Sequence, residues 1–110
     1  MNPRPPSVSQ PQRDKLPAAD VEAQLTHLFH WTLDGDAIVR KLTFTSFPDA
    51  IAFVTRLAFS AEAADHHPDL LVSYRKVTVT WSTHSAGGIT TKDFDGARES
   101  DRIAAELGGN

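Results

Sequence analysis

The sequence has no cysteine, no long apolar run and little excess charge of either sign. Without cysteine among its 110 residues, the chain has no disulfide framework, zinc–thiolate site, iron–sulfur cluster or thiol nucleophile. No run of about 18 apolar residues could span a membrane, and the N-terminus lacks the apolar core of a secretory signal. The 11 basic and 14 acidic residues give a net charge of −3, which attracts neither nucleic acid nor anionic lipid. We therefore expect a cytoplasmic protein without nucleic-acid or membrane partners.

The proline distribution divides the chain into two parts. Five of the seven prolines lie in the first 17 residues, where apolar side chains are sparse. Such a segment cannot bury enough apolar surface to offset its ordering entropy. We predict a disordered, proline-rich extension over residues 1–17 and one domain over residues 18–110, since this length suits a single core.

Hydrophobic periodicity predicts seven elements in that domain. They are a short helix capped by Asp20, strands at 31–34 and 37–45, a long helix from Ser46 to 66–67, strands at 70–75 and 77–83, and a helix from Thr90 to about Leu107. Asp34-Gly35 is a strong hairpin signal, and Thr90-x-x-Asp93 is a capping box. Two hairpins separated by a helix predict an α+β fold: a single domain with a four-stranded antiparallel sheet and helices packed on one face. Edge pairing of this sheet between subunits favours an oligomer.

The long helix is expected to bury one apolar stripe with spacings of three and four residues. The stripe comprises Phe47, Ile51, Val54, Leu57, Ala58 and Ala61.

Three of the five histidines stand at element ends, where they could share a cleft. His66 and His67 end the long helix, His84 follows the fourth strand, and Glu62 lies four residues before His66. A structural role at the helix end is one interpretation. A zinc or iron site is a second, although adjacent histidines before a proline point in different directions. Acid–base catalysis without a metal is the third, because imidazole donates or accepts protons near neutral pH.

The spacing of these residues carries a family resemblance. The chain reads Glu62-x3-His66-His67-Pro68-x5-Tyr74-x9-His84-x8-Asp93. This pattern resembles the signature of the pterin-4a-carbinolamine dehydratases at every specified position, and the similarity extends over roughly residues 20–107. The resemblance implies a homodimer or homotetramer that dehydrates a 4a-hydroxytetrahydropterin to the quinonoid dihydropterin, using no metal and no cofactor. This reaction recycles the pterin cofactor of aromatic amino acid hydroxylases.

The same resemblance implies roles for individual residues. His66 and His84 would transfer protons. His67 would be the third catalytic residue, which holds the pterin ring and helps to set its orientation. Glu62 and Asp65 would support the substrate at the rim, and Trp31 would wall the pterin pocket, although core packing explains Trp31 nearly as well.

Three aromatic or acidic positions have sufficient explanations without catalysis. Asp93 belongs to the capping box, and Tyr74 and Trp81 suit cross-strand packing, so we expect none of them to be catalytic.

Two other functions stay open at this point. One is a non-catalytic regulatory or dimerisation module with the same fold. The other is dehydration of a related pterin-like compound, because the motif reports the proton chemistry and not the substituent on the pterin.

Overall fold

The computed structural model describes residues 15–110, so the prediction of a disordered segment falls mainly on residues outside this part. The elements in chain order are α2 (Ala18–Leu25), β1 (Thr32–Asp34), β2 (Ala37–Thr43), α3 (Phe47–Ala64), β3 (Asp69–Ser73), β4 (Lys76–Trp81), the 3₁₀ turn η1 (His84–Ala86) and α4 (Thr91–Glu106). Every predicted helix and strand is present, with ends that differ by a few residues.

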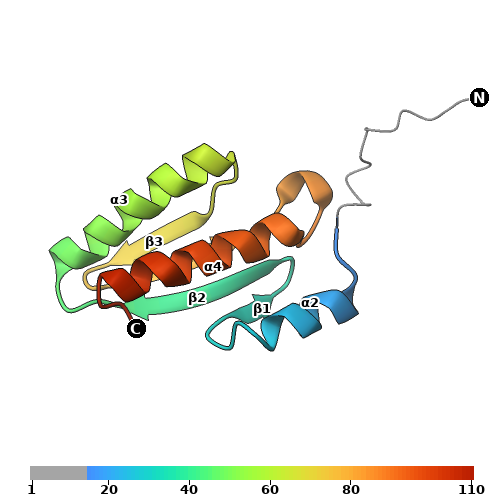
Figure 1. Ribbon diagram of the computed structural model, residues 1–110, viewed down its shortest axis with the longest axis horizontal. Helices are drawn as coiled ribbons and strands as arrows, with labels where there is room; N and C mark the ends of the chain where they lie inside the picture. Colours follow the sequence, from blue (N-terminus) through green and yellow to red (C-terminus); the bar gives the residue numbers. More distant parts are fainter. Residues whose placement is uncertain (1–14) are drawn as a thin grey trace, which may run out of the picture.

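The four strands form one antiparallel sheet in the order β1-β2-β4-β3. The α+β prediction is thus confirmed, with α3 and α4 lying side by side across one face of the sheet (Figure 1). Gly35 and Asp36 form the two-residue turn between β1 and β2, whereas Asp34 of the predicted Asp34-Gly35 signal ends β1. Gly35 has the positive φ of 61° that a tight hairpin turn demands. Because α3 and α4 run in opposite directions, the end of α3 lies near the start of α4 (Figure 1).

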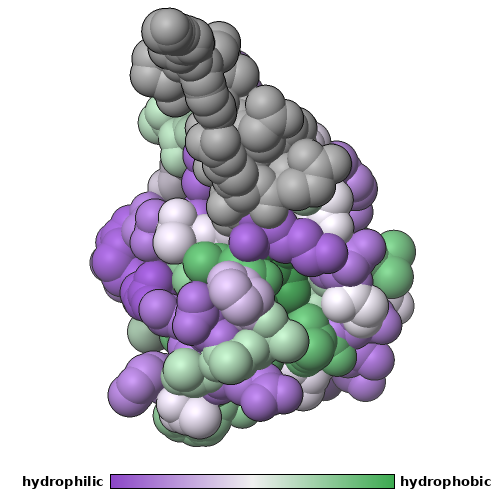
Figure 2. Space-filling view, turned by 90° about the vertical axis from the view of Figure 1, so that its right-hand side faces the viewer, coloured by the Kyte–Doolittle hydropathy of each residue, from purple (hydrophilic) through white to green (hydrophobic). Residues whose placement is uncertain are grey.

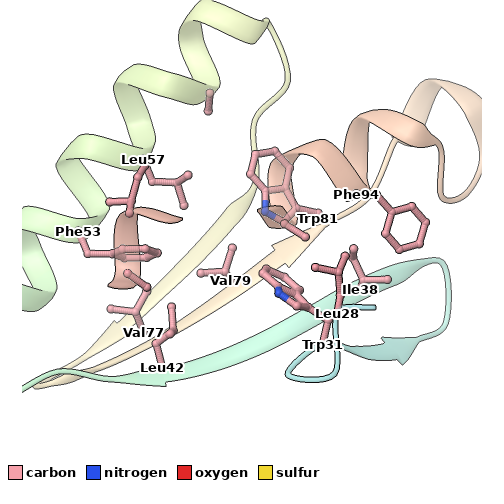
Figure 3. Packing of buried hydrophobic residues seen from close by; sticks show 14 of the residues in the cluster. Leu28, Trp31, Ile38, Leu42, Phe53, Leu57, Val77, Val79, Trp81 and Phe94 are labelled. Atoms are coloured by element: carbon pink, nitrogen blue, oxygen red, sulfur yellow. The ribbon is translucent and has the colours of Figure 1, made fainter. Parts of the chain in front are cut away.

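The core lies between the sheet and these two helices. Phe53 and Leu57 of α3 point toward Val77 and Val79 of β4 (Figure 3), and all four side chains are fully buried. Alternation along β4 places its valines inward and its threonines on the opposite face, as the period of two predicted.

The predicted buried stripe of α3 is wrong in part. Leu57 and Ala61 are buried, but Phe47 and Ile51 are 47% and 39% exposed. Val54 of the predicted stripe is half-buried, and Ala58 is exposed. Ala50 and Phe53, which lie outside the stripe, are buried instead. The helix is apolar on two adjacent sides, and periodicity by itself cannot decide which side meets the sheet.

Two local predictions are corrected by the backbone. The first helix begins at Ala18 after Pro17, and Asp20 lies in its first turn rather than at the cap. Proline fixes φ near the helical value, which lets the helix begin earlier than Asp20 implied. Tyr74 does not pack across strands: it lies in the β3–β4 turn at φ 55° and is 69% exposed, with the Arg75 guanidinium 5.4 Å from its ring.

The last residues of the predicted extension contact the domain. The Leu16 N–H donates to the Ile89 carbonyl at 2.8 Å, and the Leu16 side chain packs against the core. The Lys15 side chain lies against Gly88. The folded domain therefore begins before residue 18.

Candidate active site

The backbone at the end of α3 determines where the first histidine lies. Asp65 adopts the left-handed conformation (φ 52°, ψ 42°), and the His66 N–H then donates to the Ala61 carbonyl at 3.1 Å. This closing geometry is typical of helix C-termini, where a left-handed residue allows the last carbonyls to be satisfied. It turns the chain back, and the His66 side chain, 12% exposed, meets the start of α4.

The partner of His66 is Asp93, in the first turn of α4. The predicted capping box is confirmed, since the Thr90 N–H donates to Asp93 Oδ2 at 2.9 Å. In addition, His66 Nε2 lies 2.6 Å from Asp93 Oδ1, and the Thr83 hydroxyl donates to Oδ2 at 2.7 Å. Asp93 is completely buried. A carboxylate accepts hydrogen bonds only, so His66 donates its Nε2–H to Asp93, and in the neutral imidazole Nδ1 is then the nitrogen with a free lone pair.

An indole ring supports His66 on another side. The rings of His66 and Trp81 stack with centroids 5.3 Å apart and planes 22° apart. Trp81 is held in turn by a 3.1 Å hydrogen bond from its indole N–H to Ser100 Oγ. A Cβ on Gly96 would lie 2.6 Å from the Trp81 ring, so the absence of a side chain there lets α4 approach the indole. The imidazole is thus fixed by a hydrogen bond and by ring stacking.

A cavity of about 560 Å³ lies between the second half of α3 and the first half of α4. Its lining residues are Leu57, Ser60, Ala61, Ala63, Ala64, His66, Trp81, Lys92, Asp95, Gly96 and Glu99. Most of these side chains are small or apolar, whereas the charged ones belong to α4. Seen from the end where α3 stops and α4 begins, the surface has an apolar area bordered by hydrophilic side chains (Figure 2). His66 is the one member of the predicted histidine set that lines this cavity.

A cluster of charged side chains stiffens one wall of the cavity. Glu99 accepts hydrogen bonds from Arg102 at 2.8 and 2.9 Å and from the Ser60 hydroxyl at 2.7 Å. These contacts, with that from Arg102 the strongest, lower the pKa of Glu99 to about 2. The Ser60–Glu99 bond also ties α3 to α4, which helps to keep the two helices at a constant separation.

The second histidine and its acidic neighbour form an exposed pair. His67 Nε2 lies 2.8 Å from Glu62 Oε1, with His67 56% and Glu62 81% exposed. The sequence placed Glu62 on the helix face of His66, but Glu62 pairs with His67 instead, and neither residue lines the cavity. An exposed pair of this kind contributes little to stability, since water screens it.

The third histidine begins η1, immediately after β4. His84 is exposed, and the turn closes at Gly87, whose φ is 73°. Among residues 15–110, no hydrogen bond or ring stacking joins His84 to His66, whose partners are Asp93 and Trp81. The connection between them runs through Thr83, the neighbour of His84, whose hydroxyl binds Asp93.

The other predicted site residues are distributed differently. Asp65 is exposed and provides the turn before His66. Trp31 is buried in the core (Figure 3). Its indole N–H donates to Asp101 Oδ1 at 2.9 Å. Trp31 does not line the cavity, and its role toward a substrate stays a prediction. Within the described part of the chain, no three His, Asp or Glu side chains are grouped to hold a metal ion, and no helix is long and apolar enough to cross a membrane.

Sequence reasoning missed two members of the site. Asp93 was explained fully by its capping role, and Trp81 by strand packing, yet both contact His66. A signal was present for Asp93, because it is the last specified residue of the motif that contains the histidines. No local pattern distinguishes Trp81 from an ordinary core residue.

Comparison with known proteins places the sequence among its relatives. Residues 14–103 match the family model described as pterin 4 alpha carbinolamine dehydratase. A protein of Roseiflexus sp. (strain RS-1), provisionally named pterin-4-alpha-carbinolamine dehydratase, is 49% identical over 81% of this chain and 96% of its own length. A protein of Picosynechococcus sp. with the same provisional name is 46% identical over 81% of this chain and 97% of its own.

Two solved structures are similar in fold. A transcriptional coactivator/pterin dehydratase from Brucella melitensis superposes with a TM-score of 0.79 and 37% identity, covering 82% of this chain and 98% of that one. A pterin dehydratase-like RuBisCO assembly factor of the alpha-carboxysome has a TM-score of 0.56 and 20% identity, with coverage of 67% and 86%. The second likeness concerns the fold alone.

Proposed function

The chain belongs to the pterin 4 alpha carbinolamine dehydratase family, and we propose that it dehydrates a 4a-hydroxytetrahydropterin to the quinonoid dihydropterin by histidine acid–base catalysis. The observation that carries the proposal is the buried contact of 2.6 Å between His66 Nε2 and Asp93 Oδ1. A hydrogen bond of this kind sets the tautomer and orientation of an imidazole, which a proton-transfer group needs.

The reaction requires one proton to be delivered and one to be removed. The substrate carries a hydroxyl on C4a and a proton on N5. An acid protonates the hydroxyl, which leaves as water, while a base takes the N5 proton and the C4a=N5 double bond forms. His66, with a free lone pair on Nδ1, suits the base, and a protonated His84 suits the acid. Each turnover leaves His66 with one more proton and His84 with one fewer. Proton exchange with solvent restores both side chains.

Supporting roles follow for the exposed neighbours. His67, oriented by Glu62, would hold the pterin ring against the His66 side of the site. Asp65 would act at the rim, next to the turn that it forms. The open cavity beside His66 offers room for part of a substituted pterin.

The biological setting is the part of the proposal that comes from the family. We infer that the product feeds the recycling of the pterin cofactor of aromatic amino acid hydroxylases, and that the protein acts as a homodimer or homotetramer. Exposed large apolar side chains on several elements support self-association, and they are Phe29, Leu33, Phe47, Ile51, Phe59, Leu71 and Tyr74. Sedimentation of the purified chain measures the oligomeric state directly.

The test is stopped-flow absorbance of 4a-hydroxytetrahydropterin decay. We expect wild type to accelerate the decay, with losses of about 10²–10⁴-fold in His66→Ala and in His84→Ala. His67→Ala should mainly raise KM. His27→Ala is the matched control, because His27 is exposed and lies outside the site. Wild type without any acceleration would refute the enzyme and favour a regulatory or dimerisation module with this fold.

A further inference from the structure

Both oxygens of the Asp93 carboxylate are engaged, and they face different parts of the chain. Oδ1 meets His66, which follows α3, whereas Oδ2 accepts from the Thr83 hydroxyl at 2.7 Å and from the Thr90 N–H at 2.9 Å. One fully buried group is therefore in contact with the end of α3, the end of β4 and the start of α4.

The hydroxyl protons of this cluster can be assigned from the chemistry of the partners. Asp93 accepts only, so Thr83 donates its proton to Oδ2. The Thr83 oxygen is then free to accept from the Thr90 hydroxyl, 2.9 Å away, and Thr90 accepts from the Lys92 N–H at 3.2 Å. The result is a directed chain of donors that ends on the carboxylate, and such chains strengthen their members mutually.

Thr83 also determines the shape of the loop that presents His84. Its N–H donates to the Gly88 carbonyl at 3.1 Å, and its carbonyl accepts from the Ala86 N–H at 3.0 Å. These bonds close η1 around the residue that follows Thr83, which is His84. The backbone of His84 therefore follows the position of Thr83, and the hydroxyl of Thr83 fixes that position relative to Asp93.

We propose that Thr83 is a positioning residue for catalysis, whose hydroxyl places the His84 loop in register with the His66 imidazole through their shared contact with Asp93. Two proton-transfer groups on separate elements must both reach one substrate, one at the C4a hydroxyl and the other at the neighbouring N5–H. A displacement of about 1 Å between such groups costs on the order of 10²-fold in rate. This inference rests on the proposed dehydratase function.

The test compares two substitutions at Thr83 with one substitution in strand β4. Thr83→Val keeps the shape and the β-branched side chain but removes the hydroxyl, whereas Thr83→Ser retains it. Thr80→Val is the control, because Thr80 lies on the uncovered side of β4 and its side chain makes no hydrogen bond within residues 15–110. We expect kcat to fall by about 10²-fold in Thr83→Val with KM little changed. Thr83→Ser and Thr80→Val should stay close to wild type.

A structural readout separates positioning from a general loss of folding. In ¹⁵N-edited NMR spectra, the Ala86 and Gly87 amide signals of the His84 loop should move in Thr83→Val and stay near wild type in Thr83→Ser. The melting curve shows that each variant is folded. Should Thr83→Val fail to fold, Thr83→Ala with the same comparison to Thr83→Ser replaces it.

The outcomes distinguish this inference from the proposed function. Full activity in Thr83→Val or Thr83→Ala, or equal losses in Thr83→Ser, would overturn the positioning role and leave the dehydratase intact. An inactive wild type would overturn the dehydratase, and the positioning role with it.

Discussion

Replacing Asp93 by asparagine should invert the tautomer of His66 while leaving the fold in place. The amide keeps one oxygen and exchanges the other for an NH2 donor. In wild type, Oδ2 of Asp93 accepts hydrogen bonds from the Thr83 hydroxyl and the Thr90 N–H, whereas Oδ1 contacts one nitrogen, His66 Nε2. The lower-energy orientation therefore directs the amide oxygen to Thr83 and Thr90 and the NH2 group to His66. His66 must then accept at Nε2 and carry its proton on Nδ1.

The magnitudes follow from this count. All three contacts persist as neutral hydrogen bonds, so the loss is that of charge assistance, about 1–3 kcal/mol of the free energy of unfolding. The effect on turnover is larger, because Nδ1 no longer has a lone pair to receive a proton. We expect kcat to fall by about 10²–10⁴-fold, the contribution of one positioned base.

Three measurements check this prediction. Urea unfolding gives the loss of stability, stopped-flow decay of the substrate gives kcat, and two-bond ¹H–¹⁵N spectra identify the protonated ring nitrogen. Asp101→Asn is the matched control, since Asp101 lies on the same helix and accepts hydrogen bonds from Trp31 and Arg40. It should lower stability without changing kcat. An Asp93→Asn variant with wild-type kcat, or with the proton still on Nε2, would refute the reasoning.

Three further predictions concern stability. Gly96→Ala should lower the free energy of unfolding by about 1–3 kcal/mol in urea titrations, because its Cβ would lie 2.6 Å from the Trp81 ring. This overpacking outweighs the better helix propensity of alanine. A gain in stability would show that the indole moves aside easily. Hydrogen bonding to Arg102 holds the pKa of Glu99 at about 2 against an ordinary 4.5, so its contribution is present above about pH 4.5 and is lost as the pH falls toward 2. The melting temperature of wild type should therefore fall toward that of Glu99→Gln over this range, and parallel curves would contradict it. Leu16→Ala should cost about 1 kcal/mol in urea titrations, since this half-buried side chain packs against the core, and an unchanged midpoint would place the start of the domain after residue 17.

Sequence periodicity was sufficient for the element order and the two hairpins, because each depends on short-range patterns. Strand alternation, the turn at Gly35 and the Thr90–Asp93 capping box are local features with direct structural consequences. The pairing of β2 with β4 joins distant residues and was fixed by the tertiary structure. The α3 stripe was not decided in this way. Two adjacent sides of α3 are apolar, and only packing against the sheet selects Ala50 and Phe53 over Phe47 and Ile51.

The motif spacing by itself indicated candidate site residues and the family to which the chain belongs. Only the tertiary structure decided how they are connected: Asp93 unites a helix cap with His66, and Trp81 stacks on the same imidazole. The physical reason is that these contacts join residues up to 27 positions apart, across the end of α3, the end of β4 and the start of α4. Their distances follow from how the two helices settle on the sheet, which no local pattern records.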